Sequence, residues 1–140
     1  MGAGKTERTR KALTVGLLMM TVLSVTVSVF IVFAGGPLVS IFCLAPESIA
    51  IGADFFRSLA PFYLIHGLGF AIRGYLEGHG DLIFSGVLGI LSMGVRLGGS
   101  YLLKDIFGIM TVAYAEGFSW IFTLAVYLLR YRYFTKKKEK

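Results

Sequence analysis

A long stretch without a charged side chain constrains this fold more than any other feature of the sequence. No Asp, Glu, Lys or Arg occurs between Lys11 and Glu47. The part from Ala12 to Ala34 is apolar and long enough to cross a bilayer, which takes about 20 residues as a helix. Because backbone polar groups find no water in lipid, such a segment must be helical. The residues Gly35-Gly36-Pro37 predict its end, and the short stretch from Leu38 to Ala45 predicts a separate interfacial turn of helix.

The composition indicates that the rest of the chain also lies in a membrane. Hydrophobic residues make up 56% and charged residues only 16% of the chain, whereas soluble proteins carry about 25% charged residues. The mean hydropathy is +0.75. We therefore predict an all-α membrane protein with four transmembrane helices. The expected layout is a basic segment at 1–11, spans at 12–34, 49–74, 82–103 and 106–129, and a basic tail at 130–140.

Positive charge is concentrated at the two ends of the chain, as the positive-inside rule expects of cytoplasmic flanks. The basic residues there are Lys5, Arg8, Arg10, Lys11, Arg130, Arg132, Lys136, Lys137, Lys138 and Lys140. An even number of spans places both termini on one side of the inner or plasma membrane, which is then the cytoplasmic side. The Lys104-Asp105 turn is expected outside. A nucleic-acid-binding domain would instead spread its basic residues over one folded face, so the lipid bilayer is the expected partner.

The first residues, "MGAGKT", contain a Gly-Lys-Thr triplet that resembles the end of a phosphate-binding loop. Such a loop needs a glycine five positions earlier, on a turn leaving a buried strand. Here the triplet leads into a transmembrane helix, so the nucleotide-binding interpretation fails. The sequence contains no Ser-His-Asp set, paired catalytic carboxylates or cofactor loop. We therefore expect neither an enzyme nor a cofactor-binding protein.

Glycine is frequent within the predicted spans. The second span contains Gly67 and Gly69, and the third contains Gly86, Gly89, Gly94, Gly98 and Gly99. Small residues allow helix backbones to approach closely where lipid offers no hydrophobic drive for association. We favour close helix packing as their role over hinges or a substrate lining.

Two charged residues lie deep within the last two spans. Arg96 lies about 10 Å and Glu116 about 15 Å from the outer ends of their helices, at 1.5 Å per residue. Because a lone charge at that depth costs several kcal/mol, we predict an ion pair between these residues. A structural role in helix packing is the favoured interpretation, with a role in proton coupling as the alternative.

Other ionisable residues of the second span are weaker candidates. His66 lies near its middle and either carries protons, since its unperturbed pKa is near 6.5, or more simply hydrogen-bonds a neighbouring helix. Asp54 and Arg57 are one helical turn apart and are expected to pair locally as an anchor. Arg73 and Glu77 pair if the helix continues past the span.

A metal site formed by Glu77, His79 and Asp81 is conceivable. The absence of cysteine ligands and the Gly-rich loop argue against it. We therefore predict no metal site.

Four stretches resemble the multidrug and toxic compound extrusion (MATE) family. "GAGKTERTRKAL" is similar to the loop before that family's ninth helix, and "GADFFRSLAPFYLIHGLGFAIRGYLEGHGD" is similar to its tenth helix and the following loop. "GILSMGVRL" resembles the eleventh helix, and "FGIMTVAYAEGFSWIF" the start of the last. Ser92, Glu77 and Gly117 depart from the family pattern, which usually has a carboxylate, a Gln or Arg, and a proline at these positions.

The resemblance implies a twelve-helix transporter with two six-helix lobes, of which this chain corresponds to the last four helices, within the C-terminal lobe. The implied function is export of small organic, cationic substrates by alternating access, coupled to Na+ or H+, together with the missing N-terminal helices. The alternatives are a complete four-helix exporter acting as a dimer, and a non-transporting membrane subunit. Small exporters carry their key carboxylate in the first helix, and 12–34 contains none.

Overall fold

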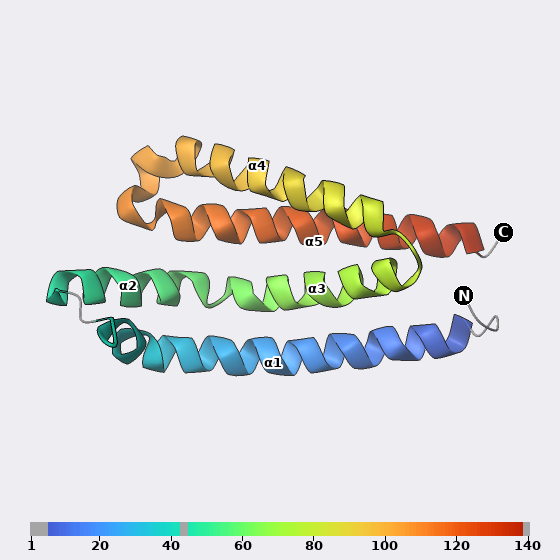
Figure 1. The fold of residues 1–140 in the computed structure, drawn as a ribbon, viewed down its shortest axis with the longest axis horizontal. Helices are drawn as coiled ribbons and strands as arrows, with labels where there is room; N and C mark the ends of the chain where they lie inside the picture. The colour runs from blue at the N-terminus through green and yellow to red at the C-terminus, as the bar shows by residue number, and fades with distance from the viewer. Residues whose placement is uncertain (1–5, 43–44, 139–140) are drawn as a thin grey trace.

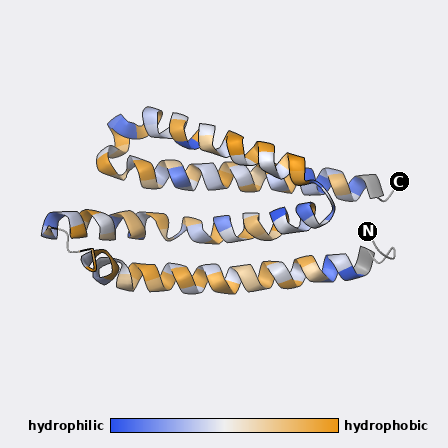
Figure 2. Cartoon of the chain, in the orientation of Figure 1, coloured by the Kyte–Doolittle hydropathy of each residue, from blue (hydrophilic) through white to orange (hydrophobic). Residues whose placement is uncertain are grey.

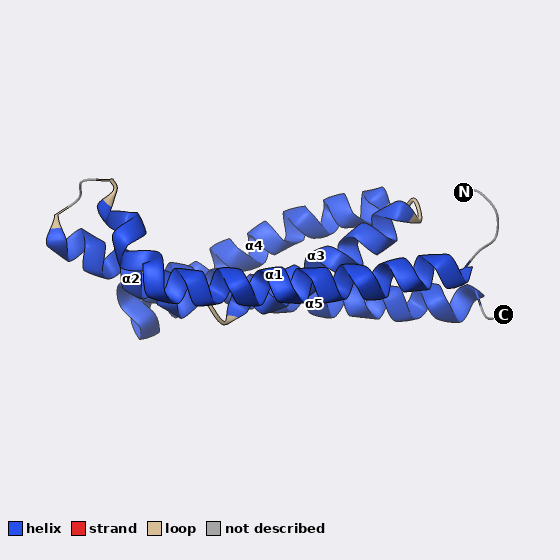
Figure 3. Ribbon diagram, turned by 90° about the horizontal axis from the view of Figure 1, so that it is seen from below, coloured by secondary structure: helices blue, strands red, loops and turns tan. Residues whose placement is uncertain are grey.

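The computed structural model describes residues 6–42 and 45–138, and these ranges are helical apart from short turns (Figure 3). The helices are α1 (Thr6–Ser40), α2 (Pro46–Leu59), α3 (Phe62–Gly78), α4 (Leu82–Phe107) and α5 (Thr111–Lys138), with the short 3-10 turn η1 (Gly108–Met110) between the last two. They form an elongated bundle in which α2 and α3 follow one another in a single row between α1 and α5 (Figure 1). Both ends of the chain lie at the same end of this bundle. The all-α prediction is confirmed.

Two helical stretches are long and apolar enough to cross a membrane, Arg8–Ser40 and Leu82–Lys136, and a third is added if the bent pair of α2 and α3 counts as one span. The second stretch contains both α4 and α5, of 26 and 28 residues, which are antiparallel (Figure 1). Each arm exceeds the length of about 20 residues that one crossing requires. The fold therefore accommodates four crossings, and the membrane boundaries of the spans stay a prediction.

Helix α1 continues through Gly35-Gly36-Pro37, so the predicted stop at this triplet is wrong. Pro37 lies inside the helix, where it removes one backbone hydrogen bond and bends the helix instead of ending it. The last turns of α1 accordingly change direction in Figure 1. Both glycines face α2, where a Cβ would make ordinary contacts, at 3.4 Å from the Cβ of Phe56 for Gly35 and at 3.9 Å from that of Ala53 for Gly36. The predicted separate turn at Leu38–Ala45 is also wrong, since its first residues belong to α1.

The second predicted span is broken into α2 and α3, which are bent by 53° at their junction. The cause is Pro61, which lacks the N-H that would continue the helical hydrogen bonds. A neighbouring helix supplies a new partner at the break, because the hydroxyl of Ser28 in α1 donates a hydrogen bond of 2.8 Å to the Ala60 carbonyl. In lipid, such a side-chain donor replaces the water that a broken helix would otherwise need.

The reversal between α4 and α5 lies at Gly108, later than predicted. Lys104 and Asp105 belong to the last turns of α4, so the predicted turn at these residues is wrong. Gly108 adopts a φ of 52°, a left-handed conformation that glycine tolerates without steric cost. The hydroxyl of Thr111 then donates to the carbonyls of Gly108, at 2.7 Å, and Leu103, at 3.2 Å. The reversal thus uses local hydrogen bonds to end one helix and start the next.

The buried core lies between α3, α4 and α5 and is formed by Ile72, Leu76, Leu88 and Tyr127. Many large apolar side chains elsewhere are exposed, as expected of helices that face lipid. Phe33 is 81% exposed and Ile83 84% exposed. Figure 2 shows the corresponding pattern, with hydrophobic residues along α1 and α4 and hydrophilic residues gathered towards the helix ends.

The predicted close packing of glycines is confirmed only in part. A Cβ at Gly67 would overlap Ser24 of α1, so this glycine allows α1 and α3 to approach. Gly99 faces Ala115 of α5 at an ordinary contact distance of 3.5 Å. The remaining five, Gly69, Gly86, Gly89, Gly94 and Gly98, have nothing within 4 Å of such a Cβ. For these five the prediction is wrong among the described residues.

Candidate functional site

A cavity of about 130 Å³ lies between α3, α4 and α5 and collects most of the ionisable residues of the spans. Its lining includes His66 and Arg73 from α3, Arg96 from α4, and Glu116 and Trp120 from α5. Sequence reasoning named four of these five as candidates but did not predict that they share one cavity. The bundle brings them together because α3 and α4 both pack against α5.

The predicted ion pair between Arg96 and Glu116 is present. A guanidinium nitrogen of Arg96 lies 2.7 Å from Oε2 of Glu116, and the pair links the antiparallel helices α4 and α5. The Arg96 side chain is 44% exposed and that of Glu116 is 21% exposed. The carboxylate is thus the more enclosed partner, and the arginine reaches it from the open side of the cavity.

His66 is held by aromatic contacts. Its ring centroid lies 4.3 Å from that of Trp120 in α5 and 4.8 Å from that of Phe70 in its own helix. The predicted hydrogen bond to a neighbouring helix is not found among the described residues. The ring thus links α3 to α5 through its contact with Trp120.

Two departures from the family pattern lie at contacts with α5, and the structure explains the glycine at position 117 but not the serine at position 92. The hydroxyl of Ser92 donates to Gly89 within α4, and its carbonyl accepts a hydrogen bond of 3.0 Å from Ser119 of α5. Gly117 faces the ring of Phe62, and a Cβ at this position would lie 2.6 Å from the ring. Both positions therefore allow α5 to lie close to its neighbours, which sequence reasoning missed.

The other predicted pairs are present, but they lie at the edge of this site or away from it. Arg73 lines the cavity and donates a hydrogen bond of 2.6 Å to Glu77. Arg57 and Asp54 lie 3.2 Å apart, with side chains 60% and 61% exposed. An exposed pair of this kind contributes little to stability, in agreement with the local anchor predicted for it.

An ion pair that sequence reasoning missed closes the end of the bundle. Arg130 of α5 donates two hydrogen bonds, of 2.7 and 3.1 Å, to the Asp81 carboxylate at the start of α4. Its guanidinium also lies 4.7 Å from the ring centroid of Phe84. The hydrogen bond to Asp81 raises the pKa of Arg130 above its usual value. No local signal points to this contact, because the two residues are 49 positions apart.

The three residues considered as metal ligands have separate partners. Glu77 accepts from Arg73, Asp81 accepts from Arg130, and the His79 ring donates from Nδ1 to the Tyr75 carbonyl at 2.7 Å. Their polar atoms are thus engaged in fixing helix ends. The arrangement supports a structural role for all three.

An all-helical bundle with exposed apolar faces and an ion pair beside a small cavity between helices is typical of an integral membrane protein. The MatE family model matches residues 1–102 of the chain. This match covers more than half of the 140 residues, so the chain belongs to the MatE family of membrane transporters, which are not enzymes. No curated protein and no solved structure matches the chain. The family match ends within α4, and α5 with Glu116 lies beyond it.

Proposed function

We propose that this chain forms part of a cation-coupled antiporter that exports small organic cations by alternating access, with protons as the coupling ion. The observation that carries this proposal is the single carboxylate of Glu116, which lines the cavity and is neutralised by Arg96. A carboxylate can accept either a proton or a cationic substrate, and the two then compete for it.

The cavity lining favours a proton over sodium as the ion that binds here. Hard metal cations are held by several oxygen ligands, carboxylates among them. The described lining offers one carboxylate, whose Oε2 Arg96 already occupies, and otherwise only the hydroxyls of Ser92, Ser119, Thr123 and Tyr127. A proton needs only one oxygen. Protonated Glu116 no longer attracts Arg96 by charge, which frees the contact between α4 and α5 to rearrange.

The size of the cavity supports the participation of further helices. Sites for drug-sized ligands occupy about 300–1,000 Å³, and this cavity of about 130 Å³ is smaller. Its aromatic residues, Trp120 and Phe70 among them, suit an organic cation through cation–π contact. We propose that the substrate site is completed by other helices of the same transporter, or by movement of α3 against α4.

The test is efflux of a cationic dye from proteoliposomes, driven by a pH gradient or by a sodium gradient. The chain alone is compared with the chain expressed together with the upstream helices of a twelve-helix transporter. We expect export only in the second case and only with the pH gradient. Export by the chain alone would instead support a four-helix exporter, and export driven by sodium alone would refute proton coupling.

The carboxylate itself is tested with Glu116→Gln. This variant cannot change its charge with pH and offers no negative charge to a cation, so we expect loss of proton-driven export together with weaker dye binding. Asp54→Asn is the matched control, because it neutralises a carboxylate of an exposed pair outside the cavity. Equal losses in both variants would contradict the proposed role of Glu116.

A further inference from the structure

A groove of about 300 Å³ lies between α1 and α3, at the end of the bundle that carries both termini (Figure 1). It is separate from the cavity around Glu116. Its lining is largely small and apolar and consists of Thr9, Ala12, Leu13, Gly16, Ala71, Gly74, Tyr75, Gly78 and His79. A Cβ at Gly16, Gly74 or Gly78 would meet nothing within 4 Å. These glycines thus form an open floor that the described helices leave uncovered.

The rim of this groove is basic. Arg8 and Arg10 are exposed at the start of α1, next to the lining residue Thr9. Neither arginine has an ion pair within the described part of the chain. Burial and the neighbouring Tyr131 raise the pKa of the Tyr75 phenol. The positive charge of Arg10 acts in the opposite direction, because Arg10 lies near Tyr75.

Two carboxylates at this end of the bundle do not neutralise Arg8 and Arg10, because each has another partner. Glu77 is paired with Arg73, and Asp81 is paired with Arg130. Glu7 also lies at the start of α1, and its side chain is outside the described part of the chain. Among the described side chains, the exposed charges next to the groove include those of Arg8 and Arg10, and a ligand with an apolar body and an anionic head is complementary to them.

The charge beside the groove favours a lipid with an anionic head as the occupant. An extended acyl chain is thinner than a helix about 10 Å across, and it fits along a floor of glycine and alanine. Anionic lipids are in addition attracted to basic residues at the membrane surface.

We infer that this groove binds one acyl chain of an anionic phospholipid, whose phosphate is held by Arg8 and Arg10. The binding site is distinct from the export pathway, and its occupation ties α1 to α3 at this end of the bundle. The inference concerns lipid binding and does not depend on the coupling ion or the exported substrate.

The test is native mass spectrometry of the purified chain, extracted from nanodiscs of equal parts phosphatidylglycerol and phosphatidylcholine. We expect preferential retention of one phosphatidylglycerol. The double variant Arg8→Gln/Arg10→Gln is expected to reduce this preference by roughly 5- to 30-fold, as one or two basic residues near anionic lipid would. The control is Arg132→Gln/Lys136→Gln, which removes the same charge at the same end from exposed positions of α5. An equal reduction in both would show general surface attraction and overturn the inference.

The floor of the groove is tested with Gly74→Leu. A Cβ at this position meets nothing within 4 Å, and leucine favours helix more than glycine does, so we expect the fold to be preserved, which circular dichroism of the variant checks. We expect the retained lipid to be lost. Gly94→Leu in α4 is the matched control, since its Cβ also meets nothing within 4 Å. Unchanged lipid retention in Gly74→Leu would overturn the inference. It would also be overturned if Gly74→Leu lost a bound second copy of the chain and not a lipid.

Discussion

At the scale of single residues, the ionisable groups of the spans are paired or stacked across helices. Arg96 is held by Glu116, and His66 lies against Trp120. Polar side chains in lipid find partners because an isolated one is costly. Among the buried serines, the hydroxyl of Ser119 donates to the Ser92 carbonyl, whereas the hydroxyl of Ser85 has no hydrogen-bond partner within the described residues.

The Arg96–Glu116 ion pair either fixes helix packing or takes part in proton coupling, and two variants distinguish these roles. Arg96→Gln leaves Glu116 without its partner, and we expect a loss of about 1–2 kcal/mol of stability, reduced by the exposure of the arginine. The charge-reversed double variant Arg96→Glu/Glu116→Arg is expected to restore the thermal midpoint in detergent. If the pair only fixes packing, the double variant also restores export. If Glu116 binds the coupling proton, the double variant does not restore export.

The buried serines give a prediction on stability. Ser85 is 1% exposed without a partner, whereas Ser119 is 4% exposed and bonded to Ser92. Leaving a buried polar group unpaired costs about 1–3 kcal/mol. We therefore expect Ser85→Ala to raise the thermal midpoint or leave it unchanged, and Ser119→Ala to lower it by the equivalent of about 1 kcal/mol. Circular dichroism on heating measures both thermal midpoints. A clearly lower midpoint for Ser85→Ala would contradict the unpaired state of the Ser85 hydroxyl.

At the scale of elements, three proline and glycine positions shape the helices, each in a different way. Pro37 bends α1 without ending it, Pro61 separates α2 from α3, and Gly108 reverses the chain between α4 and α5. The outcome depends on the surroundings of each residue. At Pro61 the hydroxyl of Ser28 compensates the broken backbone, so a strong bend is stable inside the bundle.

The bend at Pro61 is expected to straighten in Pro61→Ala. The alanine restores a backbone donor, and straightening a 53° bend lengthens the distance between positions 51 and 78 by about 4 Å at 1.5 Å per residue. Spin labels at these two positions and pulsed electron paramagnetic resonance measure the change. Pro46→Ala is the control, because proline at the first turn of a helix costs no hydrogen bond. An unchanged distance would mean that packing against α1 holds the bend.

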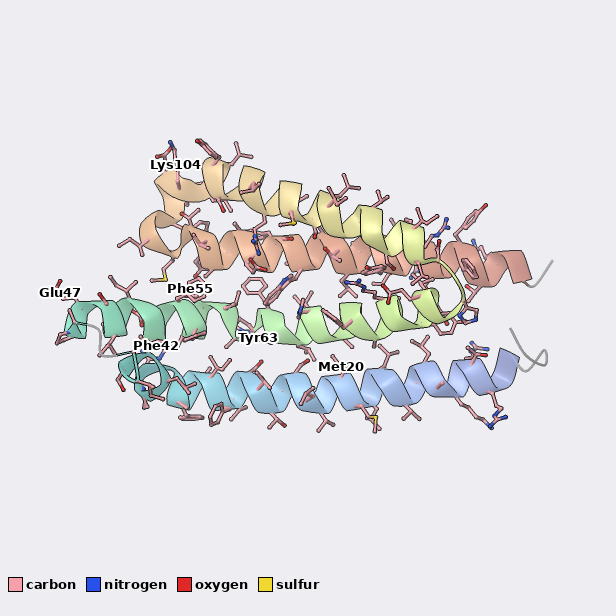
Figure 4. The ribbon with its side chains drawn as sticks, viewed as in Figure 1. Met20, Phe42, Glu47, Phe55, Tyr63 and Lys104 are labelled. Atoms are coloured by element: carbon pink, nitrogen blue, oxygen red, sulfur yellow. The ribbon has the colours of Figure 1, made fainter. Side chains whose placement is uncertain are left out.

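At the scale of the whole molecule, the charged residues separate into two ends. The termini, with most of the basic residues, lie at one end, and Glu47 and Lys104 lie at the other (Figure 4). By the positive-inside rule, we predict that the end with both termini is cytoplasmic.

The orientation is tested by labelling introduced cysteines with a membrane-impermeant maleimide. With the single natural cysteine, Cys43, replaced by serine, we expect labelling from outside intact cells at Glu47→Cys and Lys104→Cys, both exposed. Arg132→Cys is expected to react only after the membrane is opened. Labelling of Arg132→Cys in intact cells would invert the proposed orientation.

The helical nature of the chain and its local ion pairs follow from the sequence without knowledge of the tertiary structure. The length of the apolar runs requires helices in lipid, and the 3.6-residue repeat places Arg73 beside Glu77 and Arg57 beside Asp54. The Arg96–Glu116 pair was also predictable, because both residues lie at similar depth in consecutive helices.

The tertiary structure alone decided which distant groups meet. Arg130 binds Asp81, His66 stacks on Trp120, and one cavity collects residues from three helices, although nothing in the local pattern indicates this. The reason is physical. In a membrane, apolar helices gain little from hiding hydrophobic surface against each other, so their arrangement depends on detailed contacts such as those of Gly67 with Ser24 and Gly117 with Phe62. Such contacts depend on shape in three dimensions, which hydrophobicity and spacing along the chain do not encode.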